Sequence, residues 1–524
     1  MLKKYMLFIS TLFIGFGALQ AQDTIEANLM TLSKMTLNKS PLIKRNGLLI
    51  DQAEANFRSQ RSSFDYNLTS GYTISKNKLA PFDADPRNQL LTGRLETNRS
   101  DFSIGLQKRF RTGLIAEVRS NYNSASDNFP INSFGIDVGP NLSDDAASAT
   151  FSLTQPILRG NGLKVTTAFE RSAALDIESS KENFTLNTAF ELSQLGKSYW
   201  QYVAAYESLK IFESNEDRVR HVLEITRELV NGDKKPESDL VQIQADLADK
   251  ERQTTVAEQA LYSARINLGR VIGISETESQ RIGNPENTFP NVMESKFSIE
   301  NQESFFLSLA KENRKDIAAI DYTLEGLDLQ LSAAKNSTLP QLDLTGFVTY
   351  GGAAVGGGID QYFNAFSNNQ GRSAVTGLGI TFSFPLNNNL AKANLAKNNI
   401  AIEDQTIAYT NLIRNIELNV SIANNNLINS VLILEKAEET LNFYQQVFDN
   451  EQTKFQNGLT TLLNLILFQE RLTFSQLDYM QAQQQFATAI VDLRFETGTL
   501  LTSEAKAISR EDLKESFYTL PINN

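Results

Sequence analysis

The sequence predicts an α+β membrane protein in which the strands of a closed β-barrel continue into very long α-helices. Three observations predict this fold class. The second half of the chain repeats the first at a nearly constant offset, several stretches alternate strictly between polar and apolar residues, and long stretches of helical composition contain no proline. Alternation with a period of two is typical of strands, whereas sparse apolar positions every three or four residues are typical of coiled-coil helices.

The internal duplication is visible where strand-like stretches give way to helical ones. Pro156 follows one alternating stretch, and Pro385 follows another 229 residues later. Gly232 and Gly458, at an offset of 226, each come directly after an asparagine at the end of a long helical stretch. An offset this constant over more than a hundred residues indicates a repeated structural element rather than a catalytic domain.

The first residues of the chain have the three parts of a secretory signal peptide. Lys3 and Lys4 give a positive start, Met6 to Leu19 is an apolar stretch, and Ala21 is a small residue before the expected cut. The predicted organisation is a signal peptide over 1–21, a first repeat over 22–290, a second repeat over 291–502 and a C-terminal tail over 503–524.

Composition excludes several classes of function. The formal net charge of −12 disfavours nucleic acid as a partner, since phosphate binding needs clustered Lys and Arg. The chain has no cysteine and a single histidine, His221 in a charged helical stretch, so neither a thiolate metal site nor a nucleophile with its base can be assigned. No phosphate-binding Gly-x-x-x-x-Gly-Lys-Ser/Thr motif is present. We therefore expect a protein that is not an enzyme and needs no cofactor.

The alternating stretches predict strands with one apolar and one small polar face. Such strands suit an outer-membrane barrel, with lipid outside and water inside, but a soluble sandwich would show the same alternation. The first half holds four stretches, over 66–74, 102–106, 114–121 and 147–154, and the second half holds two, over 342–350 and 378–384.

The helical stretches favour the barrel over the sandwich. We expect helices over 41–63, 164–231, 239–272, 390–457 and 464–496. The stretch over 164–231 would be about 100 Å long at 1.5 Å per residue. After the signal peptide, no stretch offers the ~18 consecutive apolar residues of a membrane-spanning helix. A coiled-coil rod of the kind found in the cytoplasm is a second explanation of these helices, but the signal peptide and the strands contradict it.

Several short motifs, taken in order, resemble those of a known family. They are the junctions Gln155-Pro156-Ile157-Leu158-Arg159-Gly160 and Phe384-Pro385-Leu386-Asn387, and the run Arg314-Lys315-Asp316-Ile317 followed by Leu339-Pro340. The chain resembles the outer-membrane efflux proteins, or TolC-like channels, over its whole mature length. It departs from them at Lys315, where the family often has proline.

The resemblance implies a homotrimer in the outer membrane of a Gram-negative cell envelope. About four strands from each protomer would form the barrel, and the helices would form a periplasmic coiled-coil barrel. The implied function is a passive exit duct of a tripartite efflux or type I secretion system. Its partners would be outer-membrane lipid, a periplasmic adaptor protein and an inner-membrane pump or ABC exporter. The alternative is a structural or adhesive coiled-coil outer-membrane protein without a transport role.

The same resemblance suggests site residues. The hairpin tips expected to contact the adaptor are Gly232, Asp233, Lys234, Lys235, Pro236, Gly458, Leu459 and Thr460. The candidates for a pore constriction are Asp239, Asn464 and Leu467, the last two standing where relatives often carry aspartate. Asp239 could equally be a carboxylate that meets a helix dipole. Pro156 and Pro385 are the predicted strand-to-helix junctions, because proline lacks the N–H that would continue a sheet.

The first repeat is about 47 residues longer than the second between matched strand and proline positions. The extra residues include a predicted hairpin within 75–145. This hairpin either lengthens an external loop or adds strands to the barrel, and the sequence alone leaves both possibilities open.

Overall fold

The computed structural model describes residues 24–80, 93–128, 143–293, 295, 303–356, 358–367, 371–501 and 516–521, so the predicted signal peptide over 1–21 lies outside the described residues. The chain divides into two compact units, and each contains segments from both predicted repeats. We call them the helical unit (Met1–Gly47, Phe184–Lys315 and Arg414–Asn524) and the sheet unit (Leu48–Asn183 and Asp316–Ile413).

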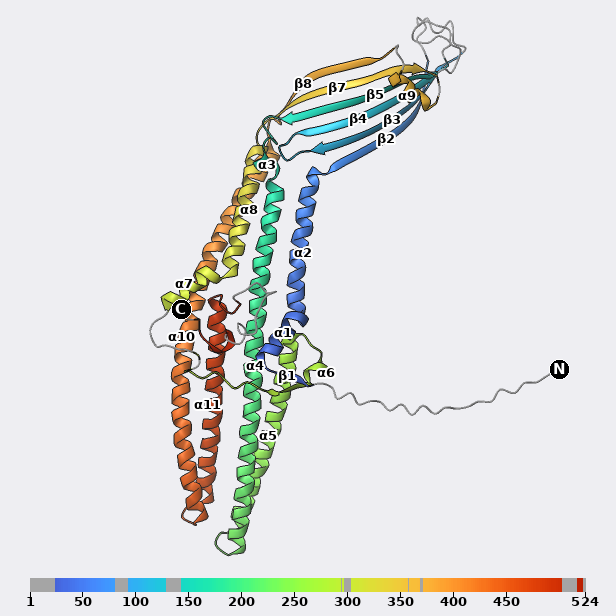
Figure 1. Ribbon diagram of the computed structural model, residues 1–524. Helices are drawn as coiled ribbons and strands as arrows, with labels where there is room; N and C mark the ends of the chain where they lie inside the picture. Colours follow the sequence, from blue (N-terminus) through green and yellow to red (C-terminus); the bar gives the residue numbers. More distant parts are fainter. Residues whose placement is uncertain are drawn as a thin grey trace, which may run out of the picture. The chain divides into compact units, whose positions relative to one another are not determined.

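The sheet unit is built around one antiparallel sheet of six strands in the order β2-β3-β4-β5-β7-β8 (Figure 1). The strands are β2 (Tyr66–Leu79), β3 (Leu95–Arg109), β4 (Ile115–Asp127), β5 (Ser143–Pro156), β7 (Gln341–Val355) and β8 (Ser373–Ser383). Each strand is next to its neighbour in sequence among these six, so the sheet is a simple meander.

The sheet has six strands, so the expected count of about four per protomer is wrong. The difference is one hairpin. The extra hairpin, β3–β4, does not form an external loop but lies in the sheet between β2 and β5. Its strands are as long as their neighbours and pair along their whole length, for example Leu68 with Leu106 and Leu106 with Val118. Alternating side chains on both strands fit the pleat of the neighbours, and this makes them part of the sheet.

The turn of this hairpin is fixed to the start of helix α4 (Ala168–Asn231). Arg111 makes a bidentate ion pair with Glu170, with N–O distances of 2.5 and 2.8 Å. Gly113 has a φ of 98°, and a Cβ at this position would lie 2.4 Å from the carbonyl oxygen of Gly160. The turn therefore requires glycine, and it packs directly on the connection that leaves β5.

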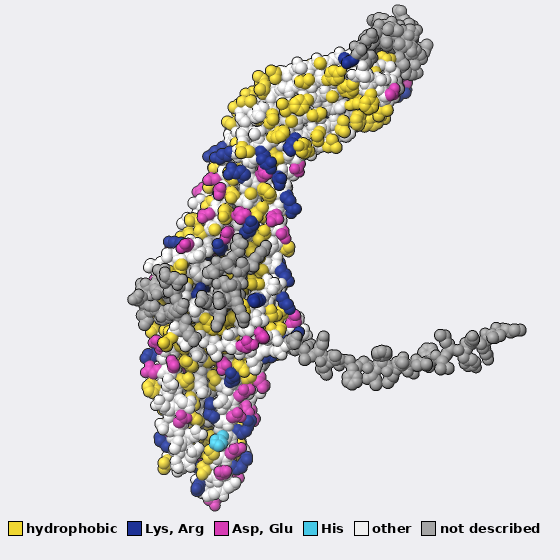
Figure 2. All heavy atoms as spheres, viewed as in Figure 1, with side chains coloured by type: hydrophobic (Ala, Val, Ile, Leu, Met, Phe, Trp, Pro, Cys, Tyr) yellow, Lys and Arg dark blue, Asp and Glu magenta, His cyan; other side chains and the backbone are white. Residues whose placement is uncertain are grey.

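The pairing register gathers the apolar residues of the strands on one face, although the row described next ends at Thr376 in β8. Leu68, Leu106, Val118, Phe151 and Val348 are successive partners across the sheet. Hydrophobic side chains cover much of the visible face of the sheet in Figure 2. Of the other face, one row consists of Thr69, Gly105, Arg119, Thr150 and Thr349. The sheet thus has the two unlike faces that the alternation predicts.

Several helices accompany the sheet. They are α2 (Pro41–Arg61), the 3₁₀ turn η1 (Ser62–Phe64), α3 (Leu163–Thr166), α8 (Lys315–Ser337) and α9 (Asp360–Ser367). Helix α9 was not expected, and it packs on the apolar face: the Tyr362 hydroxyl lies 2.7 Å from Ser120 Oγ, and its ring meets that of Tyr122 edge-on.

The helical unit contains two long helical hairpins, α4–α5 and α10–α11 (Figure 1). The helices are α4 (Ala168–Asn231), α5 (Glu237–Ile272), α10 (Asn389–Gln456) and α11 (Leu462–Glu496), of which α4 and α10 also contribute residues to the sheet unit. Their bounds agree with the predicted ones to within a few residues. At 64 and 68 residues, α4 and α10 would each extend for about 100 Å. In the described part of the chain, no helix is both long and apolar enough to cross a bilayer.

Smaller elements complete the helical unit. They are α1 (Leu29–Lys39), a parallel pair of strands β1 (Ile25–Ala27) and β6 (Ile282–Pro285), α6 (Glu276–Ser279) and α7 (Glu303–Asn313). A core around Trp200 joins α1, α4, α5 and α11, and it includes Phe517 from the C-terminal segment. The described part of the predicted tail, 516–521, is therefore packed into the unit.

Candidate functional site

The first hairpin tip reverses the chain between α4 and α5. The N–H of Lys234 donates to the carbonyl of Leu229 over 2.9 Å, and that of Asp233 donates to Val230 over 3.0 Å, which together make a Schellman turn. The left-handed residue is Asp233, with a φ of 54°. Gly232 matches Gly458 in the duplication but does not take the left-handed conformation, which falls on the next residue. Aspartate tolerates the left-handed region better than most residues.

The second tip, between α10 and α11, reverses the chain at its glycine. Gly458 has a φ of 72°, and the N–H of Leu459 donates to the carbonyl of Lys454 over 2.9 Å. Thr461 caps α11 by accepting from the N–H of Asn464 over 3.3 Å. The Thr460 hydroxyl donates to the Glu451 carboxylate, which lowers the pKa of that carboxyl group. This tip is thus held by its own side chains.

The two tips touch one another. Lys235 Nζ, from the first tip, donates to the carbonyl oxygen of Thr460 in the second over 3.2 Å. The same ammonium lies 5.3 Å from the centre of the Phe455 ring, within the range of a cation–π contact. Residues matched by the duplication therefore meet at one end of the helical unit, and Lys235 is the link between them.

The constriction candidates lie in the first turns after the tips. Asp239 is half-buried in the first turn of α5, where its carboxylate also faces the positive end of the helix dipole. Asn464 is exposed in the first turn of α11 and donates its amide to the Thr460 hydroxyl over 3.3 Å. Leu467 follows on the same helix with 45% of its surface exposed.

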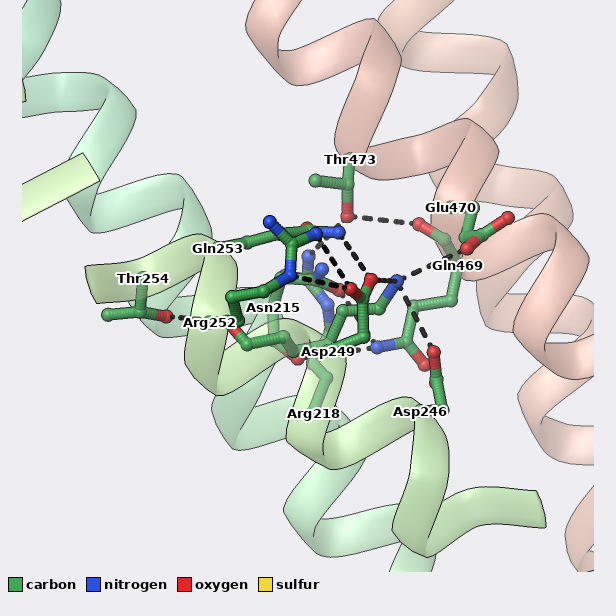
Figure 3. Close-up of polar contacts among 11 residues, drawn as sticks. Asn215, Arg218, Asp246, Asp249, Arg252, Gln253, Thr254, Gln469, Glu470 and Thr473 are labelled. Atoms are coloured by element: carbon green, nitrogen blue, oxygen red, sulfur yellow. Dashed lines mark hydrogen bonds and ion pairs between the residues drawn. The ribbon is translucent and has the colours of Figure 1, made fainter. Parts of the chain in front are cut away.

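A polar network crosses the apolar core between the two hairpins (Figure 3). Gln469 of α11 is 2% exposed, and its amide donates to the side-chain oxygen of Asn215 of α4 over 2.9 Å. Arg218, one turn further along α4, donates to the Thr473 hydroxyl over 3.3 Å. These bonds fix the axial position of α11 relative to α4, because sliding one helix along the other would leave buried polar groups unpaired.

Lys250 extends this network to α5. It is 3% exposed, and its ammonium lies 3.3 Å from an oxygen of Asp246 and 3.2 Å from one of Glu470. Burial opposes the charge on Lys250, but the two carboxylates outweigh burial and raise the pKa of Lys250. Burial also raises the pKa of Asp246, although Lys250 acts against it. Adjacent residues of α11, Gln469 and Glu470, thus bind the two helices of the first hairpin.

This network was missed in the sequence, although a signal for it exists. Ile243, Lys250, Ala257 and Ala264 follow one another every seven residues and are all buried. A lysine in a seven-residue apolar repeat is a known means of fixing register in coiled coils. In α11, Gln469 stands seven residues after the buried Leu462. The sequence could therefore have identified Lys250 and Gln469 as polar residues at buried positions, but it could not have identified the residues that they bind.

The junction prolines lie between strand and helix in both halves. Pro156 is the last residue of β5, and its neighbour Ile157 still donates to the Leu342 carbonyl over 2.7 Å. Pro385 comes two residues after β8 and four before α10. Among the described residues, no group of three acidic, histidine or cysteine side chains could hold a metal ion.

The second half of the chain matches a known family. Residues 306–499 match the model of the outer membrane efflux proteins. No curated protein sequence matches the chain.

Solved structures of outer-membrane proteins share the fold. VceC from Vibrio cholerae is 13% identical, with a TM-score of 0.64 over 90% of this chain and 96% of that one. The CmeC outer membrane channel of Campylobacter jejuni is 15% identical, with a TM-score of 0.62 over 95% and 92%. The open MtrE outer membrane channel of Neisseria gonorrhoeae is 14% identical, with a TM-score of 0.61 over 91% and 94%.

These findings confirm the resemblance and the fold class predicted from the sequence. The chain has the TolC-like fold of outer-membrane channels, and its second half carries the sequence pattern of the outer membrane efflux proteins.

Proposed function

We propose that the protein is the outer-membrane exit duct of a tripartite efflux or type I secretion system. Three copies would form a barrel in the outer membrane and a helical tunnel in the periplasm. Substrates would be delivered by an inner-membrane pump through a periplasmic adaptor, and the duct itself would do no chemistry. The proposal includes the predicted two-repeat organisation over 22–290 and 291–502.

The observation that carries this proposal is the combination of a two-faced sheet with long helical hairpins. One face of the sheet exposes large apolar side chains: Leu68 is 66% exposed and Ile380 is 74% exposed. Such a face suits lipid, while the opposite face, rich in Ser, Thr and Gly, suits water. The match over residues 306–499 and the fold shared with outer-membrane channels support the same function.

Adaptor binding belongs to the hairpin tips in this proposal. They form one end of the helical unit and present exposed residues, among them Leu459 at 77% exposure. Lys235 joins the two tips, so an adaptor would bind a single surface made from both. Asp239, Asn464 and Leu467, in the first turns beyond the tips, would set the narrowest part of the tunnel.

Reconstitution tests the function directly. The purified protein in a planar lipid bilayer should give single-channel conductance, and a strain that lacks it should become sensitive to compounds that its cognate pump exports. Absence of conductance together with unchanged sensitivity would favour the alternative, a structural or adhesive coiled-coil protein.

Cysteine crosslinking tests the adaptor surface. Leu459→Cys and Lys234→Cys should form crosslinks to the adaptor encoded with the pump, whereas Asn77→Cys on β2 should not. The chain contains no cysteine of its own, so each variant carries a single thiol. Equal crosslinking at all three positions would contradict the assignment of the tips.

A further inference from the structure

The sheet ends in two strands that each have a single neighbour among the described residues. β2 pairs with β3, and β8 pairs with β7, so one edge of each strand carries backbone N–H and C=O groups that the sheet does not use. The two edges are at opposite sides of the sheet (Figure 1). In lipid, such edges are costly because no water satisfies them, and closed barrels are the way in which sheets avoid them.

Both faces of the sheet extend to these edges, and in β8 only Val375 on the polar face and Thr376 on the apolar face depart from the pattern. Apolar residues lie on one face of β2, as at Leu68 and Tyr72, and on the same face of β8, as at Leu378 and Ile380. Small residues lie on the other face, as at Thr69 in β2. A strand that pairs with either edge must therefore match this two-sided pattern. The edges of a second copy of the chain do so.

The direction of the strands also fits. In the meander, β2 and β8 run antiparallel to one another, with β2 beginning and β8 ending at the side where the helices attach. β8 of one copy can therefore pair in antiparallel fashion with β2 of the next. This arrangement keeps the start of β2 and the end of β8 of every copy on the same side of the barrel.

We propose that three copies close a barrel of eighteen strands, six from each copy, through β8–β2 pairing between neighbours. This inference rests on the proposed function as a trimeric duct, and it departs from the twelve strands that the resemblance implies. With a strand spacing of about 4.8 Å and a tilt of about 40°, the backbone diameter is about 36 Å for eighteen strands, against about 24 Å for twelve.

The hairpin β3–β4 is the cause of the wider barrel, and it also supplies charge to the lumen. On the polar face it carries two ion pairs, Arg99 with Asp101 at 2.9 Å and Arg119 with Glu117 at 2.7 Å. The polar face of β8 has instead small residues such as Gly377, Gly379 and Thr381. Water thus fills a wide lumen that is lined by fixed charges on the added strands.

The joint between copies can be tested by disulfide crosslinking. Aligning the helix-side ends of β2 and β8, with like faces together, places Thr69 of one copy opposite Thr381 of the next. Thr69→Cys/Thr381→Cys should convert to a covalent species of three chains upon oxidation, and reducing agent should restore single chains. Because register can differ by two residues, Thr69→Cys should also be paired with Gly379→Cys and with Ser383→Cys.

A matched control uses a strand inside the sheet. Thr69→Cys/Thr345→Cys places the second thiol on the same polar face but on β7, which already has two neighbours. This pair should stay monomeric under the same oxidation. Crosslinking of the β7 pair, with none between β2 and β8, would overturn the inference.

Counting strands gives an independent measurement. Electron cryomicroscopy of the wild-type protein in lipid nanodiscs should resolve eighteen strands, and native mass spectrometry should give three chains. Two chains with twelve strands, or three chains with twelve strands and a displaced hairpin, would overturn the eighteen-stranded barrel while leaving conductance intact. Loss of the proposed function would instead be seen as absence of conductance, whatever the number of strands.

Discussion

Gln469 and Asn215 lie 254 residues apart in the chain, and their side chains are joined by a buried hydrogen bond of 2.9 Å. Gln469 is 2% exposed, as is Asn215, so water has no access to replace either partner. This bond lies between apolar layers of two different hairpins. A buried polar pair of this kind does more for the register of two helices than for their stability.

The register function predicts an asymmetry between single and double variants. Gln469→Leu should lower the free energy of unfolding by about 1–3 kcal/mol, because the Asn215 amide loses its partner. The double variant Asn215→Leu/Gln469→Leu should recover most of this loss. Denaturant titration in detergent, followed by tryptophan fluorescence, measures both. If the double variant loses as much free energy of unfolding as Gln469→Leu, or more, the two side chains are not coupled in this way.

The two hairpin tips should respond differently to alanine. Gly458→Ala forces a φ of 72° on a residue with a side chain and should cost about 1–2 kcal/mol. Gly232→Ala should be nearly neutral, because Asp233 takes the left-handed conformation at that tip. The thermal unfolding midpoint of each variant, compared with that of the wild type, measures this difference. A larger loss for Gly232→Ala would contradict the reversal described at the first tip.

Gly196 should not tolerate a methyl group. A Cβ there would lie 2.8 Å from the ring of Phe517, which is fully buried, and 3.3 Å from Val491. Gly196→Ala should therefore destabilise the helical unit and expose the C-terminal segment to protease. Gly47→Ala is the matched control, since its Cβ meets Phe184 at an ordinary 3.8 Å and alanine favours helix. Unchanged protease resistance in Gly196→Ala would refute the packing.

The Arg111–Glu170 pair makes stability depend on pH in one direction. The hydrogen bond from Arg111 lowers the pKa of Glu170 below its ordinary value of 4.5. The stabilisation of the folded state by this ion pair is therefore complete above the ordinary pKa of Glu170, and it is lost as pH falls through the lower pKa of the folded state. At pH 7, Glu170→Gln should unfold at a lower midpoint than the wild type. The difference between the two midpoints should shrink as the pH is lowered towards 3. Glu54→Gln, at an exposed position of α2, should show no such trend.

The constriction proposal predicts a change in ion selectivity. Three Asp239 carboxylates around one axis would attract cations and repel one another. Asp239→Asn should reduce cation selectivity in single-channel reversal potentials and weaken block by trivalent cations, whereas Leu467→Ala should leave selectivity unchanged. Unaltered selectivity in Asp239→Asn would leave Asp239 as a helix-start carboxylate.

The sequence predicted the elements far better than their partners. Period-two alternation located all six strands of the antiparallel sheet, including those of the extra hairpin, but it could not say that β3 and β4 join the sheet. The count of four came from the family and not from these residues. The two long hairpins followed from the absence of proline, because local composition decides where a helix can continue.

The burial of polar residues could not be predicted from the local sequence. Lys250 is charged, and charged residues are seldom buried unless paired, so only its position in a seven-residue repeat marked it. Its partner Glu470 lies 220 residues away. Asp233 was missed for a different reason: a glycine next to it was the more obvious candidate for a left-handed turn.

The core around Trp200 joins residues from nearly the whole described length of the chain. Leu32 of α1 and Phe517 of the C-terminal segment are both fully buried in it. A polypeptide is synthesised from its N-terminal end, so Leu32 is present long before Phe517 is. Until Phe517 is present, apolar side chains of α4 such as Trp200 lack part of the core that covers them, and exposed apolar surface of this kind favours aggregation. A chain truncated before Phe517 therefore leaves this core incomplete.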